Sequence, residues 1–133
     1  MRVAFDHVGL SVADLEAAEA FYTTAFGFAR QLAFDLSPHP IRGVMLNHAE
    51  GFRLELFEHS SSVPGLQAAT PIEAHATRGY NHFALRTTDI DGLWESALEA
   101  GATAVMAPGD SPEPGVRFAF FADPEGNLVE LVG

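Results

Sequence analysis

The chain has 133 residues, no cysteine and a formal net charge of −11 at pH 7, since it carries 18 acidic but only seven basic residues, all arginine. Without cysteine it cannot form disulfides or zinc–thiolate sites, so a bound metal must use His, Asp or Glu. The charge argues against a nucleic-acid partner, and the absence of a ~20-residue apolar run or a signal-peptide pattern predicts a cytoplasmic protein without a membrane span.

The first half predicts a strand, a helix and three more strands. The expected elements are a strand at 3–12, a helix at 15–26 and strands at 28–36, 41–47 and 52–58. Asp14 is the expected N-cap of the helix, and Gly27 is expected to end it. In the last strand Leu54 and Leu56 point to one side, so Glu55 points to the other.

The second half follows the same plan after a linker at 60–78, which is rich in Ser, Pro and Ala. Its expected elements are a strand at 81–87, a helix at 90–100 and strands at 103–107, 115–122 and 127–132. Asp89 is the expected N-cap and Gly101 the expected stop. Helical spacing favours a core position for Trp94 over contact with a ligand.

The two halves align without a gap at an offset of 75 residues, with eleven identities against roughly four or five expected by chance. The identical pairs are His7/His82, Leu10/Leu85, Asp14/Asp89, Ala25/Ala100, Ala29/Ala104, Asp35/Asp110, Arg42/Arg117, Glu50/Glu125, Gly51/Gly126, Glu55/Glu130 and Leu56/Leu131. We therefore predict one α+β domain of duplicated βαβββ modules, at 1–59 and 79–133, whose curled mixed sheets surround a metal-binding cavity.

The repeated polar side chains predict a metal site. Strand alternation places His7 and His82 on the side away from the helices, together with Glu55 and Glu130 in the closing strands. Each Glu follows its His by 48 residues. Glu130 lies within NLVELV, and a carboxylate among apolar neighbours must be paired or neutralised.

A divalent cation would neutralise this set, since two neutral imidazoles and two carboxylates match its charge. Nitrogen and oxygen ligands suit Ni²⁺, Co²⁺, Zn²⁺, Mn²⁺ or Fe²⁺, and the sequence does not choose among them. The histidines that do not recur at the offset are expected at the surface: His39, His48, His59 and His75. Arg86 lies on the same side as His82, where it is either an anion contact or an ordinary surface residue.

The stretches DHVGLSVADLEAAEAFYTTAFGF and FFADPEGNLVEL make the chain resemble the vicinal oxygen chelate superfamily. The order His7, Glu55, His82, Glu130 is similar to that of bacterial-type glyoxalase I. This resemblance implies a metal-dependent lyase or isomerase that moves a proton next to a carbonyl through a metal-stabilised enediolate. Glu130 is then the first choice as proton-transfer base, with Glu55 as the alternative.

Two positions depart from the glyoxalase I pattern. Ser11 stands where that pattern has a glutathione-contacting Arg, and His59 stands where it has Asn. The resemblance therefore implies a small α-hydroxycarbonyl or thioester substrate, and leaves its identity and the use of glutathione open. The alternatives are a non-catalytic protein that binds a small molecule such as an antibiotic, and an extradiol-type dioxygenase.

Exposed sheet edges favour symmetric association, so we expect a homodimer. The four ligands can meet within one chain or across such a dimer, and the sequence does not decide between these arrangements.

Overall fold

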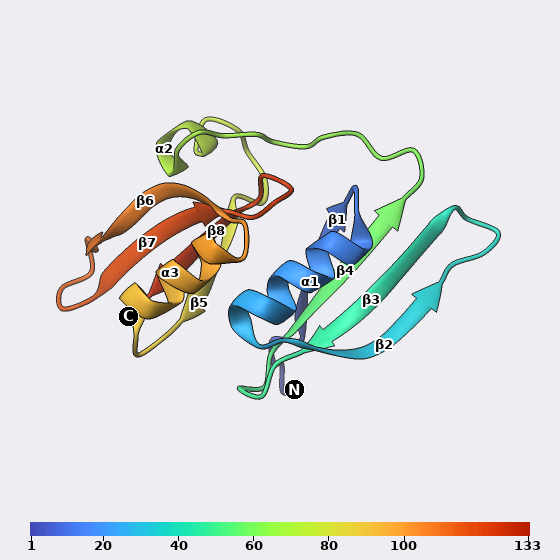
Figure 1. The fold of residues 1–133 in the computed structure, drawn as a ribbon, viewed down its shortest axis with the longest axis horizontal. Coiled ribbons are helices and arrows are strands. Elements are labelled where there is room, and N and C mark those ends of the chain that lie inside the picture. The colour runs from blue at the N-terminus through green and yellow to red at the C-terminus, as the bar shows by residue number, and fades with distance from the viewer. The chain divides into compact units, whose positions relative to one another are not determined.

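The computed structural model describes residues 1–133, which divide into two compact units, Met1–Val63 and Pro64–Gly133. Unit 1 contains β1 (His7–Val12), α1 (Leu15–Phe26), β2 (Ala29–Asp35), β3 (Ile41–Asn47) and β4 (Arg53–His59). Its four strands form one sheet in the order β1-β4-β3-β2, in which β1 is parallel to β4 and the other neighbours are antiparallel (Figure 1).

Unit 2 repeats this topology. Its elements are α2 (Pro71–Ala74), β5 (His82–Arg86), α3 (Ile90–Glu99), β6 (Thr103–Asp110), β7 (Arg117–Ala122) and β8 (Leu128–Val132). The strand order is β5-β8-β7-β6, again with one parallel pair, β5 and β8. The predicted α+β fold of duplicated βαβββ modules is confirmed, and the segment predicted as a linker contains the short helix α2.

In each unit the helix covers one face of the sheet (Figure 1). Leu54 and Leu56 are 1% and 0% exposed beneath α1, whose buried stripe includes Tyr22 at 0%. In unit 2, α3 buries Trp94, which confirms its predicted core position. Because strand residues alternate between faces, Glu55 lies on the face that α1 does not cover.

Both long helices begin as predicted. The Asp14 carboxylate accepts a hydrogen bond from the Ala17 amide at 2.9 Å, and Asp89 accepts one from the Gly92 amide at the same distance. α1 ends at Gly27, whose φ of 75° is the left-handed conformation that glycine adopts most easily.

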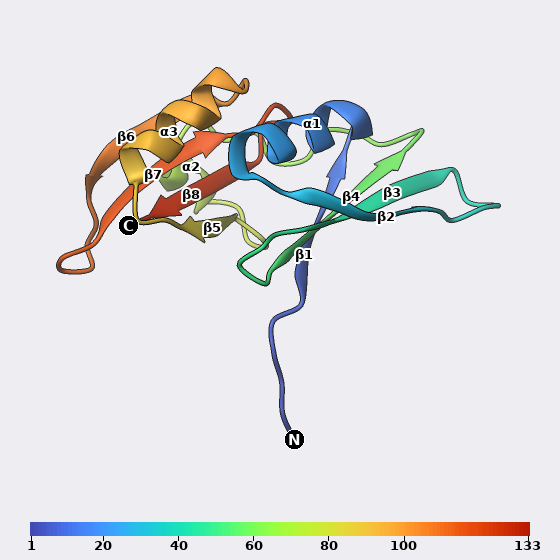
Figure 2. The same ribbon diagram turned by 60° about the horizontal axis from the view of Figure 1, so that its bottom comes forward.

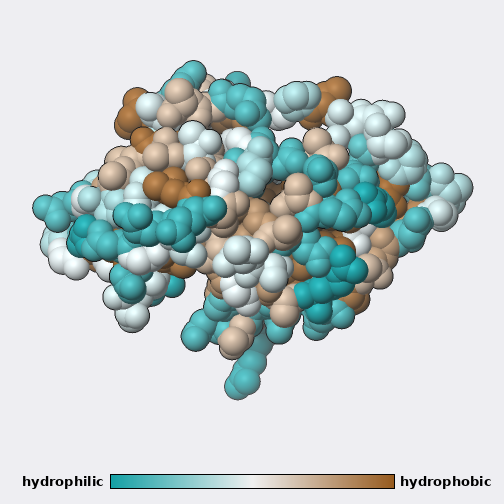
Figure 3. All heavy atoms as spheres, in the orientation of Figure 1, coloured by the Kyte–Doolittle hydropathy of each residue, from teal (hydrophilic) through white to brown (hydrophobic).

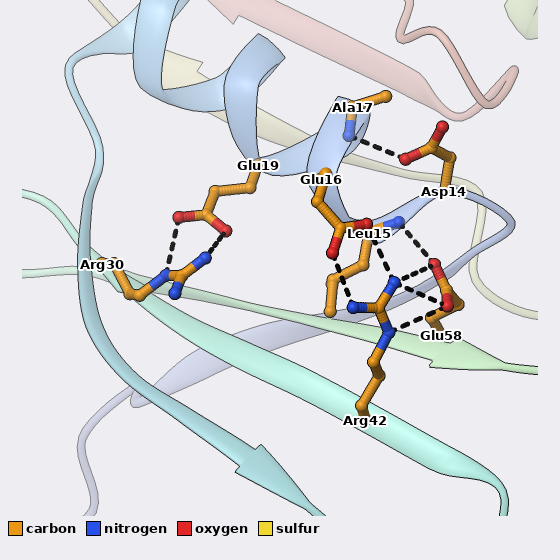
Figure 4. A network of polar contacts seen from close by, with 8 residues as sticks. All are labelled: Asp14, Leu15, Glu16, Ala17, Glu19, Arg30, Arg42 and Glu58. Carbon is orange, nitrogen blue, oxygen red and sulfur yellow. Dashed lines mark hydrogen bonds and ion pairs between the residues drawn. The ribbon is translucent and has the colours of Figure 1, made fainter.

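An arginine joins the first turn of each long helix to its sheet. Arg42 on β3 contacts Glu16 at 2.6 Å and Glu58 at 2.9 Å, and Glu58 also accepts a hydrogen bond from the Leu15 amide (Figure 4). Its counterpart Arg117 on β7 contacts Asp91 at 2.7 Å. These hydrogen bonds lower the pKa values of the Glu16 and Asp91 carboxyl groups.

The first strand is shorter than we predicted. β1 starts at His7, which pairs with Arg53, the first residue of β4. The chain turns before Arg53, so Val3 and Phe5 have no strand beside them and are 88% and 76% exposed. Figure 2 shows this N-terminal segment leaving the edge of the sheet of unit 1.

Hydrophilic and hydrophobic residues are intermixed on the face shown in Figure 3. No helix combines the length and apolar character that a membrane crossing requires.

Candidate metal and proton-transfer site

Unit 1 brings two of the four predicted ligands together. His7 opens β1 and Glu55 lies on the neighbouring strand β4, where it is in register with Gly9. The Nε2 atom of His7 lies 3.4 Å from Oε1 of Glu55. A Cβ atom at Gly9 would already lie 3.8 Å from the same Oε1 atom, so the small residue leaves space beside the carboxylate.

Unit 2 brings the other two together in the same way. His82 opens β5, and Glu130 on β8 is in register with Ala84, another small residue. The Nε2 atom of His82 lies 3.1 Å from Oε2 of Glu130. The ring of Phe120 contacts that of His82 edge-on, with 5.0 Å between centroids.

The backbone around each carboxylate is buried while the carboxylate itself is reachable. Val129 and Leu131 are both 0% exposed, whereas the Glu130 side chain is 20% exposed and that of Glu55 is 19% exposed. A neutral imidazole nitrogen and a carboxylate oxygen are ligands that divalent transition metals accept. Each pair therefore offers one nitrogen and one oxygen ligand of the kind a divalent metal ion binds.

Neither unit by itself gathers three or more His, Asp or Glu side chains that could hold a metal ion. That the four side chains share one cation stays a prediction.

The sequence did not identify the residue before each histidine as part of the site, although these two residues are also 75 positions apart. Asp6 contacts Nδ1 of His7 at 2.5 Å, and Oδ1 of Asn81 contacts Nδ1 of His82 at 2.6 Å. Hydrogen bonds from His7 and Arg53 lower the pKa of the Asp6 carboxyl group. Asp and Asn are not identical, so the alignment of identities did not select them.

The remaining histidines are not members of the two pairs, although His75 contacts Asn81, the neighbour of His82, at 3.4 Å. His48, expected at the surface, is half-buried. Its ring stacks on that of Phe52, with 4.6 Å between the ring centroids, and its Nε2 atom lies 2.8 Å from the Phe26 carbonyl oxygen. His39 is exposed and lines a surface pocket of about 390 Å³ that contains none of the four predicted ligands. Arg86 is exposed on β5.

The chain matches a known protein family and is similar to two enzymes of known name. The family model described as Glyoxalase/Bleomycin resistance protein/Dioxygenase superfamily matches residues 4–131. Lactoylglutathione lyase GLX1 of Arabidopsis thaliana is 28% identical over 131 residues, which are 96% of this chain and 43% of that protein. The 2-epi-5-epi-valiolone epimerase of Actinomyces sp is 28% identical over 149 residues, covering 98% of this chain and 79% of the epimerase.

Solved structures show the same fold. Glyoxalase I from Zea mays has a TM-score of 0.74 and 26% identity, covering 95% of this chain and 44% of that one. A glyoxylase/bleomycin resistance protein/dioxygenase domain from Frankia sp. has a TM-score of 0.80 and 20% identity, covering 99% and 98% of the two chains. This chain spans less than half the length of the lactoylglutathione lyase it matches.

Proposed function

Because the chain belongs to the glyoxalase/bleomycin resistance protein/dioxygenase superfamily, we propose that it is a metal-dependent lyase or isomerase of the glyoxalase type. It would transfer a proton at the carbon next to a carbonyl group of a small substrate. The observation that carries this proposal is the recurrence of a close His–Glu pair on the uncovered face of both sheets. Relatives named as a lactoylglutathione lyase and an epimerase support the reaction class.

The residues that would hold the divalent cation are His7, Glu55, His82 and Glu130. When bound, the cation would polarise the substrate carbonyl and stabilise the negative charge that proton removal creates. Which of Ni²⁺, Co²⁺, Zn²⁺, Mn²⁺ or Fe²⁺ serves is a matter for metal analysis.

Glu130 is the proposed proton-transfer base, and Glu55 is its counterpart in unit 1. A general base needs a reachable carboxylate on a support that keeps it in place. Glu130 meets both conditions, because its strand neighbours Val129 and Leu131 are fully buried while its own side chain is partly exposed. Phe120, in register with Glu130 on β7, places an apolar ring beside the pair.

The proposed substrate takes account of two residues on the strands that carry the site of unit 1, Ser11 on β1 and His59 on β4. Ser11 and His59 stand where the glyoxalase I pattern has Arg and Asn, so that pattern does not carry glutathione recognition over to this chain. The proposed substrate is an α-hydroxycarbonyl or thioester compound, and the substrate panel decides whether glutathione is used. Two half-buried rings, Phe34 and Phe57, pack edge-on with 5.5 Å between centroids. Phe57 is two residues beyond Glu55 on β4, so both lie on the same face and the substrate should carry an apolar portion.

A homodimer is part of the proposal. β1 and β5, the strands that carry the two histidines, are edge strands of their sheets, and exposed edges favour association. The native mass in solution, measured with and without metal, tests this. The ligand set could close within each chain or between the two chains.

Metal analysis of protein purified without chelator is the decisive experiment. We expect near-stoichiometric divalent metal in the wild type and in His39→Ala, the matched control, and loss of metal in His82→Ala. Glu130→Gln should keep the fold and lose turnover by several orders of magnitude on whichever compound is turned over in a panel of α-hydroxycarbonyls and thioesters. The panel includes the hemithioacetal of methylglyoxal and glutathione.

Other outcomes would redirect the assignment. A metal-free protein that binds aromatic compounds equally well after chelation would be a binding protein. Aerobic cleavage of catechol with added Fe²⁺ would identify a dioxygenase. Wild-type activity in Glu130→Gln would remove Glu130 from the mechanism.

A further inference from the structure

Each histidine of the candidate site is contacted on its second ring nitrogen by the residue that precedes it. In unit 1 the partner of His7 Nδ1 is the Asp6 carboxylate at 2.5 Å, and in unit 2 the partner of His82 Nδ1 is the Asn81 amide oxygen at 2.6 Å. Asp6 and Asn81 are 75 residues apart, so the same device occurs at equivalent positions of both units.

The contact in unit 1 determines which nitrogen of His7 carries the proton. An ionised carboxylate has no proton and only accepts hydrogen bonds. Nδ1 of His7 must therefore be the donor, and in the neutral ring Nε2 is left with a free lone pair. That lone pair is on the nitrogen that lies 3.4 Å from Glu55.

In unit 2 a third residue orients the amide. The Asn81 Nδ2 group donates toward Nδ1 of His75 at 3.4 Å, which directs Oδ1 of the same amide toward His82. An amide oxygen only accepts, so Nδ1 of His82 is again the donor and Nε2 is unprotonated in the neutral ring. This Nε2 lies 3.1 Å from Glu130.

A neutral imidazole with its proton on Nδ1 cannot donate a hydrogen bond from Nε2, so the contact with the carboxylate is a hydrogen bond only when Nε2 also carries a proton. In the neutral ring of each unit, Nε2 and a glutamate oxygen lie close together as two lone-pair donors, and a cation would bind both. In the metal-free protein, Nε2 of the neutral ring is therefore the nitrogen available to bind a metal ion.

The two units support this contact differently. Asp6 is also paired with Arg53, whose Nη1 donates to Gln31 at 3.2 Å, so a chain of polar contacts links it to β4 and β2. The position equivalent to Arg53 in unit 2 is Leu128, and Asn81 is held instead by His75, which follows α2. The charged Asp6 polarises its histidine more strongly than the neutral Asn81 does.

We propose that Asp6 and Asn81 are positioning residues, which hold the Nδ1–H group of the following histidine so that Nε2 faces the glutamate of the same unit, and that Asp6 makes His7 the stronger metal ligand of the two histidines. The metal-binding role rests on the proposed function, whereas the proton position in each ring does not. The two parts can therefore be measured separately.

The first measurement is the proton position in the metal-free protein of residues 1–133. Long-range ¹H–¹⁵N correlation spectra of ¹⁵N-labelled protein distinguish protonated from unprotonated ring nitrogens, and His7→Gln and His82→Gln assign the signals. At a pH where both rings are neutral, we expect each ring to carry its proton on Nδ1. Protonation on Nε2 instead, in either ring, would overturn the proposal for that unit.

The second measurement is the Co²⁺ affinity, determined by competition with a chromophoric chelator. Asp6→Ala and Asn81→Ala should each weaken Co²⁺ binding about 10- to 100-fold, the usual effect of losing such a partner. Asp6→Asn keeps a hydrogen-bond acceptor for Nδ1 of His7 and should lose less Co²⁺ affinity than Asp6→Ala. Glu50→Ala removes one carboxylate from an exposed turn and should bind Co²⁺ as the wild type does.

The outcomes separate the two proposals. Wild-type protein that binds no Co²⁺ would overturn the metal-dependent function and the positioning role with it. Wild-type binding with unchanged affinity and unchanged ring protonation in Asp6→Ala and Asn81→Ala would overturn the positioning role alone. Far-UV circular dichroism of each variant checks that any loss of affinity occurs in folded protein.

Discussion

Gly43→Ala tests the packing of the uncovered face of unit 1. A Cβ atom at position 43 would lie 2.4 Å from Cζ of Phe34 and 2.7 Å from the carbonyl oxygen of Leu56. Both distances are well inside van der Waals contact. Phe34 can rotate, but the Leu56 carbonyl belongs to the backbone of β4 and can move only with its strand.

The expected cost is that of overpacking. Adding one methyl group to a packed site typically costs about 1–3 kcal/mol, and the immobile backbone oxygen places Gly43→Ala in the upper half of that range. The assay is urea denaturation, in which the midpoint should fall while the slope stays unchanged. In a Phe34→Ala background, Gly43→Ala should cost less, because the clash with the ring is gone. The remaining cost is that of the clash with the Leu56 carbonyl oxygen.

Gly65→Ala is the matched control, because a Cβ atom there has no heavy atom within 4 Å. The same substitution in open space should change stability little or raise it slightly, by reducing the entropy of the unfolded chain. A Gly43→Ala variant as stable as Gly65→Ala would refute the packing of β2 and β4 around Gly43.

Three further variants test the core, a helix end and an ion pair. Leu56→Ala removes a fully buried side chain and should cost about 2–5 kcal/mol in urea denaturation; a loss below 1 kcal/mol would contradict its burial. In Gly27→Ala the added Cβ atom contacts no other atom, but the left-handed backbone at this position should lower the free energy of unfolding by about 1 kcal/mol. A variant as stable as the wild type would argue against that conformation. Because Arg117 lowers the folded-state pKa of Asp91, this pair stabilises the protein above pH ~4 and the effect is lost as the pH falls through the folded pKa. Asp91→Asn should therefore show a flatter pH dependence of thermal stability below pH 4 than the wild type, and identical profiles would exclude a contribution from the pair.

The alternation of apolar and polar residues, together with the 75-residue repeat, was sufficient to predict the fold. Alternation decides which residues share a face of a strand, so it predicted that Glu55 and Leu56 lie on opposite sides of β4. The repeat extended this result to Glu130 and Leu131. These features depend on the local period of the chain and on hydrophobic burial, both of which can be read from the order of the residues.

The tertiary structure decided the contacts that depend on register and on side-chain direction. β1 begins at His7 because its partner strand begins at Arg53, a limit set by another segment of the chain. The hydrogen bonds between Asp6 and His7 and between Asn81 and His82, and the packing of His48 against Phe52, also arise only in the folded structure. Such contacts form between groups whose distance and direction are set by the whole unit, so residue type and spacing alone do not determine them.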